Sequence, residues 1–99
     1  MRFDGFDWDV GNLRKAQRHG LKIEEIEEFF NREVFVLEDS EHSQNERRFI
    51  AVGAGRNNRS MFVSFTLRRK GDEVLIRVIS ARYTHKREAK IYEEVKKEK

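Results

Sequence analysis

The last third of the chain contains the stretch that decides the fold, Glu73-Val-Leu-Ile-Arg-Val-Ile-Ser-Ala-Arg-Tyr-Thr-His-Lys-Arg-Glu88. Residues 74–81 are β-branched and almost uniformly apolar, and such a run predicts a mostly buried strand. Arg77 interrupts the apolar run, and Arg82 lies where the strand ends. Functional side chains are often placed where a strand ends, so both arginines are candidate catalytic residues.

The geometry of a strand limits how these two arginines can act together. Side chains alternate between the two faces of a regular strand, so a separation of five residues puts Arg77 and Arg82 on opposite faces. Both can serve one site only if the strand twists or bulges near Ser80. Arg77 also has a second interpretation, because it could extend its charge to solvent or pair with Glu73 or Glu46.

Basic residues follow directly at the predicted start of a last helix. His85, Lys86 and Arg87 place cations in its first turn, where the helix macrodipole disfavours positive charge. A local cost of this kind suggests a ligand that carries negative charge. We therefore predict that these residues contact phosphate, although His85 could simply open the helix.

The composition bounds the class of protein. The chain has 99 residues, a formal net charge of +3 and a pI near 9.4, and 39% of its residues are charged. The length predicts a single domain, residues 1–99. The positive net charge favours an acidic partner or nucleic acid over a membrane. Cysteine is absent, which excludes disulfides and thiol nucleophiles. No apolar run of about 18 residues and no signal-peptide pattern occurs, so we expect a cytoplasmic protein.

Hydrophobic periodicity predicts the remaining elements. Asp9 is predicted to be the N-cap of a helix that ends at His19-Gly20, and apolar residues at three- and four-residue spacing predict a second helix from Ile23 to Phe30. A first strand is expected within residues 2–8, and four later strands are expected at residues 34–37, 48–52, 61–67 and 74–81. The order β-α-α-β-β-β-β-α indicates an α+β fold with helices on one face of an antiparallel sheet.

Several kinds of chemistry have no support in the sequence. The three histidines have no metal-ligand spacing, so we expect no metal site and no cofactor. Gly53-Ala-Gly55 lacks the lysine and the helix of a phosphate-binding loop, and no nucleophile elbow is present. The remaining cations, histidines and carboxylates suit metal-free RNA cleavage, in which the substrate's own 2′-hydroxyl attacks the adjacent phosphate. That reaction needs a base, an acid and cations for the phosphorane.

A polar loop at residues 38–46 supplies the acid and base candidates. His42 and Glu46 can each move a proton, although His42 could be only solvated and Glu46 could be only the salt-bridge partner of an arginine. Arg48 and Lys15 are expected to contact RNA, and Lys15 could equally be solvated surface. Arginine suits phosphate because its planar fork meets two oxygens at once.

Four segments of the chain resemble, in order, the motifs of one protein family. Residues 79–88, with Tyr92-Glu93 behind them, are similar to the I-S-A-R-x-A-x-x-x-E-x-x-x-Y-E signature of the BrnT toxins, the nuclease half of a bacterial type II toxin–antitoxin pair. Phe6–Gly20 is similar to that family's opening motif, W-D-x-x-N-x-x-K-x-x-K-H-G, and Ile23–Phe29 is similar to its glutamate-rich second helix. His42-Ser43 and Glu46–Gly53 together are similar to its H-S…E-E-R-F-I-A-I-G segment. The resemblance spans almost the whole chain.

The resemblance carries expectations about fold and activity. It implies a RelE-like fold and an endoribonuclease toxin that a cognate antitoxin neutralises. In the family that antitoxin is a BrnA-like ribbon-helix-helix protein, and the complex binds operator DNA. Arg82 falls on the signature arginine of the family, whereas Arg47 stands where a glutamate is usual. A non-catalytic RNA- or protein-binding module of the same fold is therefore the alternative.

Overall fold

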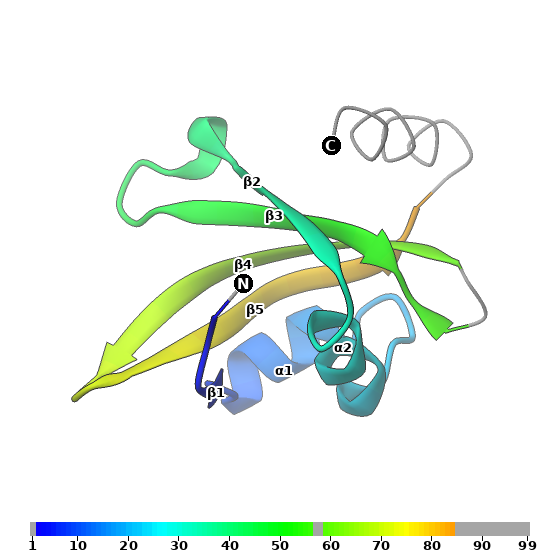
Figure 1. Ribbon diagram of the computed structural model, residues 1–99, viewed down its shortest axis with the longest axis horizontal. Helices are drawn as coiled ribbons and strands as arrows, with labels where there is room; N and C mark the ends of the chain where they lie inside the picture. The colour runs from blue at the N-terminus through cyan, green and yellow to red at the C-terminus, as the bar shows by residue number, and fades with distance from the viewer. Residues whose placement is uncertain (1, 57–58, 85–99) are drawn as a thin grey trace.

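The structure is a computed structural model that describes residues 2–56 and 59–84. It contains one five-stranded sheet, two α-helices and a short 3-10 helix, so the predicted α+β class is confirmed (Figure 1). The elements are β1 (Gly5–Phe6), α1 (Val10–Ala16), α2 (Ile23–Phe30), β2 (Val34–Glu38), η1 (Ser40–His42), β3 (Arg48–Ala54), β4 (Ser60–Lys70) and β5 (Glu73–Tyr83). The predicted last helix lies outside the described residues. Neither described helix is long and apolar enough to cross a membrane.

The strands lie in the order β1-β5-β4-β3-β2, and the four longer strands form an antiparallel meander. β1 pairs in parallel with residues 75–76 of β5, so the prediction of a wholly antiparallel sheet is wrong at this edge. The physical reason is that no hairpin joins β1 to β5. The direction of β1 is set by α1, which follows it and places Asn12 against the carbonyl of Val78 further along β5.

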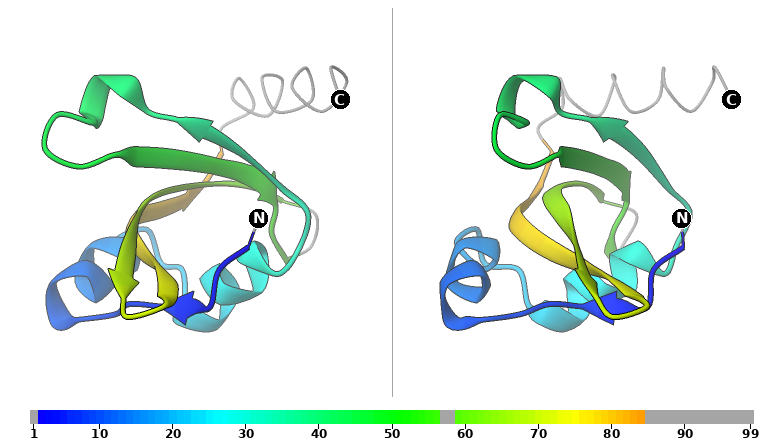
Figure 2. Two further views of the ribbon diagram at one scale, coloured as in Figure 1. Left: turned by 60° about the vertical axis from the view of Figure 1, so that its left-hand side comes forward. Right: turned by 90° about the vertical axis from the view of Figure 1, so that its left-hand side faces the viewer.

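The hydrophobic core lies between the helices and one face of the sheet. In both views of Figure 2, α1 and α2 lie on the same side of the strands. Ile26 and Phe29 of α2 are fully buried, as are Phe65, Ile76 and Val78 of the sheet, and each such burial contributes about 1.5–3 kcal/mol. The helical spacing of apolar residues in α2 predicted this face correctly. Because the helices occupy this face, the polar residues of the strands lie on the other one.

The first helix begins as its sequence predicts. Asp9 is the N-cap, and its carboxylate accepts a hydrogen bond of 2.9 Å from the backbone N–H of Asn12, whose side chain in turn accepts from the N–H of Asp9. The helix ends at Ala16, earlier than the predicted His19-Gly20. A turn replaces its last residues, and Gly20 closes that turn with a positive φ of 82°.

Candidate active site

A bulge in β5 determines which side chains share the open face of the sheet. Ser64 pairs with Ser80 and Phe65 pairs with Val78, so Ile79 is one extra residue in β5. The extra residue reverses the alternation of side chains beyond it. Arg77 and Arg82 therefore lie on the same face, opposite the helices. A twist or bulge near Ser80 was the condition for both to serve one site, and β5 has a bulge there.

Cross-strand register adds a third arginine to this face. Arg48 of β3 pairs with Thr66 of β4, and Thr66 pairs with Arg77 of β5. Residues that pair directly across neighbouring strands point to the same side of a sheet. The open face therefore carries Arg48 on β3 and Arg77 and Arg82 on β5. β4 lies between these two strands in the sheet.

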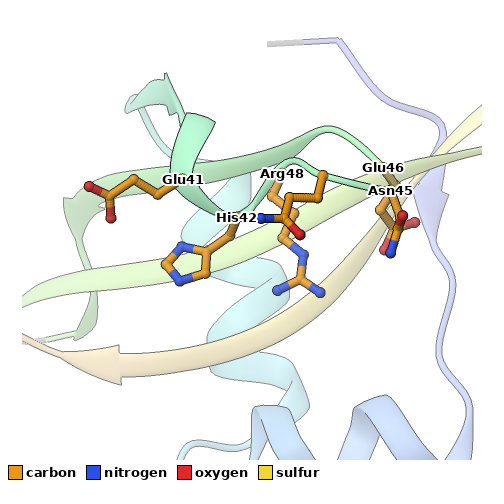
Figure 3. A pocket seen from close by; sticks show the side chains of 6 residues that line it. Glu41, His42, Asn45, Glu46 and Arg48 are labelled. Carbon is orange, nitrogen blue, oxygen red and sulfur yellow. The ribbon is translucent and has the colours of Figure 1, made fainter.

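A hollow of about 270 Å³ on this face brings three predicted site residues together. His42 follows β2 in the 3-10 helix, Arg48 begins β3, and Arg82 lies near the end of β5. The other side chains of the hollow are Asp39, Ile50, Phe62, Ser64, Ile79 and Ser80. Figure 3 shows the His42 ring and the Arg48 guanidinium pointing to the same side of the β2–β3 connection, while Glu41 points away. An imidazole and two guanidinium groups thus line one space.

Arg48 is the residue that joins neighbouring parts of the site. Besides the first hollow it lines a second, which contains the predicted residues Lys15, Glu46 and Arg77 together with Arg68. The Nε of Arg48 is buried and has no hydrogen-bond partner among the described residues. A buried donor left unpaired costs about 1–3 kcal/mol, and an anionic oxygen bound at the site would satisfy it.

Glu46 and Arg77 already have ionic partners. Arg77 donates from Nη2 to Oδ2 of Asp9 at 2.6 Å, and its Nη1 lies 3.7 Å from Oδ2 of Asp7. Its partners are therefore the N-cap region of α1 rather than Glu73 or Glu46. Glu46 pairs with Arg68, with 3.6 Å between Oε2 and Nη2. The backbone N–H of Asn12, and then the guanidinium of Arg77, lower the pKa of Asp9.

His42 is held by two residues that sequence reasoning missed. Its Nδ1 lies 2.9 Å from Oδ2 of Asp39, whose side chain is 16% exposed whereas that of His42 is 61% exposed. The hydroxyl of Ser43 donates to the carbonyl of Asp39 at 2.6 Å and accepts from the backbone N–H of Arg48 at 2.9 Å. The signal that could have found Asp39 is its spacing of three residues before His42, which one helical turn brings together.

Arg82 packs against an aromatic ring of the same hollow. Its guanidinium carbon lies 5.2 Å from the ring centroid of Phe62, its register partner in β4. A contact of this kind between a guanidinium and an aromatic ring helps to hold the charged group in place. The predicted phosphate contacts His85, Lys86 and Arg87 lie outside the described residues. Within residues 2–56 and 59–84, no cluster of three or more His, Cys, Asp or Glu could hold a metal ion.

Comparison with known protein families identifies the class to which this fold and site belong. Residues 8–88 match the family described as the ribonuclease toxin, BrnT, of type II toxin–antitoxin systems. Because the match covers most of the chain, the protein belongs to the BrnT family, and the resemblance in its motifs is confirmed. Membership indicates a ribonuclease toxin with RNA as its target and an antitoxin as its partner. A search of curated protein sequences gave no match.

Proposed function

We propose that the protein is an endoribonuclease that cleaves RNA without a metal ion, through attack of the 2′-hydroxyl on the neighbouring phosphate. The observation that carries the proposal is the convergence of His42, Arg48 and Arg82 on one hollow of the open face. Three elements that are distant in sequence contribute to it, and the bulge at Ile79 is what puts Arg82 there. A surface without function has no need of this arrangement.

The two arginines of the hollow are suited to hold the phosphate. Arg48 and Arg82 would each offer paired N–H donors to its oxygens, and the unpaired Nε of Arg48 would gain a partner. Charge on those oxygens increases in the phosphorane, so donors fixed in advance stabilise the transition state more than the substrate. Removing one such donor typically costs about 100- to 1000-fold in rate.

The second hollow extends the surface along the RNA. Lys15 lies there beside Glu46, Arg68 and Arg77, and it would contact a phosphate next to the cleaved one. Glu46 is the second acid–base candidate, because it lines this second hollow together with Arg48. Arg77 would act mainly through its charge, since Asp9 holds its guanidinium against α1.

The antitoxin and the cellular context belong to the same proposal. We propose that the partner is a BrnA-like ribbon-helix-helix protein, that the complex binds operator DNA, and that the toxin works in the cytoplasm. The RelE-like topology is also proposed. These points rest on family membership.

Cleavage of bulk RNA by the purified protein in excess EDTA tests the proposal. We expect fragments that end in 2′,3′-cyclic phosphate, and we expect Arg82→Ala to cleave at least about 100-fold more slowly with an unchanged circular dichroism spectrum. The matched control is Arg47→Ala, because Arg47 is 71% exposed and pairs with Glu38 outside both hollows. RNA that is bound but stays intact would instead favour the non-catalytic module.

A further inference from the structure

The hydrogen bond between Asp39 and His42 selects one form of the imidazole. An ionised carboxylate can only accept hydrogen bonds, so the Nδ1 that lies 2.9 Å from Asp39 carries a proton. In the neutral ring the other nitrogen, Nε2, then holds a lone pair. With the ring neutral, Nε2 therefore offers the substrate a proton acceptor.

The backbone around this pair is tied to the strand that carries Arg48. Asp39 donates from its N–H to the carbonyl of Arg48 at 2.8 Å, and Ser43 joins the same two residues through its hydroxyl. The backbone segments that carry His42 and Arg48 are thus held together. A base and a phosphate-binding cation need a fixed separation to act on adjacent atoms of one nucleotide.

The charges that face His42 come from three elements and oppose one another. Asp39 lies beside Nδ1 of His42, and Arg48 of β3 and Arg82 of β5 line the same hollow. Glu41 and Glu46 line a neighbouring hollow with His42, and the Glu41 side chain points away from the ring in Figure 3. Asp39 is thus placed to stabilise the imidazolium that forms when the ring takes a proton.

We propose that His42 is the general base of RNA cleavage and that Asp39 is the positioning residue that sets its tautomer. The inference rests on the ribonuclease function proposed above. Nε2 of His42 takes the proton of the 2′-hydroxyl while O2′ forms its bond to phosphorus. The bond between phosphorus and O5′ breaks with its electron pair on O5′, which takes a proton from water, and a 2′,3′-cyclic phosphate remains.

Nitrogen NMR of the imidazole rings tests the positioning role without any RNA. We expect the wild-type spectrum at neutral pH to show His42 protonated at Nδ1. In Asp39→Asn the new amide can donate to Nδ1, so we expect the proton to move to Nε2. Asp72→Asn is the matched control, because Asp72 lies in the exposed turn between β4 and β5. A ring that keeps its Nδ1 proton in Asp39→Asn would overturn the role of Asp39.

A substrate with sulfur in place of the leaving 5′-oxygen tests the catalytic role. A thiolate leaves without a proton, so such a substrate restores activity to an enzyme that lacks its general acid but not to one that lacks its base. We expect the cleavage rates of His42→Ala and Asp39→Asn on ordinary RNA to fall about 100-fold or more below that of the wild type. On the sulfur substrate we expect the same fold reduction relative to the wild type.

The possible outcomes of these measurements separate the two proposals. Recovery of His42→Ala on the sulfur substrate would make His42 the acid and overturn this inference, while the ribonuclease function would stand. Full activity of Asp39→Asn on ordinary RNA would overturn only the positioning role of Asp39. Failure of the wild-type protein to cleave RNA would refute the ribonuclease function, and the general base with it.

Discussion

Arg48 shows how a single residue can be placed for function at a cost to the fold. Its Nε is buried without a partner among the described residues, although the chain could have put an apolar side chain there. Buried polar groups are normally paired, and those that are not are found where a ligand completes them. Under the proposed function, this position gives up some stability in the free protein in exchange for a guanidinium that can bind phosphate.

Arg48→Lys should separate these two effects. Lysine keeps the positive charge but lacks the planar fork and the Nε donor, so we expect cleavage to fall about 100-fold while the melting temperature stays equal or rises. Cleavage rates and thermal unfolding measure both quantities. Arg47→Lys is the matched control, since Arg47 precedes it in the sequence and is exposed. A fall in melting temperature with unchanged cleavage would show that Arg48 is a structural residue.

The lowered pKa of Asp9 predicts how the free energy of unfolding changes in acid. The N–H of Asn12 and the guanidinium of Arg77 hold the pKa of Asp9 below its ordinary value of 3.8, so the unfolded chain binds its proton more readily than the folded one. The stabilisation is therefore present above pH about 4 and is lost as pH falls through the folded pKa. Asp9→Asn keeps the N-cap but should flatten this acid loss. Urea unfolding at a series of pH values from about 6 down to about 2 measures it, and an unchanged slope would contradict the assignment.

The connection between β2 and β3 is the element that assembles the site. Ser43 links Asp39 to Arg48 across it, in a segment where residues 43–47 belong to no helix or strand. A loop of this kind opens more easily than the strands beside it unless side chains tie it down. The hydroxyl of Ser43 therefore helps to hold the position of His42, together with the backbone bond from Asp39 to Arg48.

Ser43→Ala should loosen this connection without unfolding the sheet. We expect a loss of about 0.5–1.5 kcal/mol in the free energy of unfolding, faster hydrogen exchange at the N–H of Arg48, and slower cleavage. Ser40→Ala is the control, because the bond of Ser40 to Ser43 uses its backbone carbonyl and survives the change. Equal exchange at Arg48 in both variants would show that the hydroxyl does not hold the loop.

How far the sequence predicts the structure differs from element to element. α2 was predictable because its buried residues recur at helical spacing. The bulge in β5 was not predictable, because the sequence shows only that Arg77 and Arg82 need a bulge or twist to share a face, and not that one forms. The parallel pairing of β1 was not, since it depends on contacts of Asn12 with a strand 66 residues away in sequence. The bond between Asp39 and His42 was missed for another reason. Both residues are polar and lie in a loop, and only the 3-10 turn brings them together.

At the scale of the whole molecule, the two sides of the sheet differ in charge. α2 contributes Glu24, Glu25, Glu27 and Glu28 on the helix side, where three of them already bind neighbours: Glu25 binds Tyr83, Glu27 binds Trp8 and Glu28 binds Arg56. The open face carries Arg48, Arg77 and Arg82. A polyanion is therefore attracted to this part of the sheet and repelled by the glutamates of α2. A protein that inhibits the toxin by covering the site would compete with RNA for the same cations.

The antitoxin is accordingly expected to cover the open face. An acidic segment that orders on binding would pair with Arg48 and Arg82 and exclude RNA from the hollow. We expect addition of antitoxin to protect residues 39–48 and 74–83 from hydrogen exchange, and the dissociation constant to rise with salt because the paired charges are screened. Arg82→Gln should weaken the complex and reduce its salt dependence, whereas Glu24→Gln on α2 should change neither. Protection confined to α2 and β1, with the hollow still exchanging freely, would mean that the antitoxin inhibits from the helix side by changing the shape of the site.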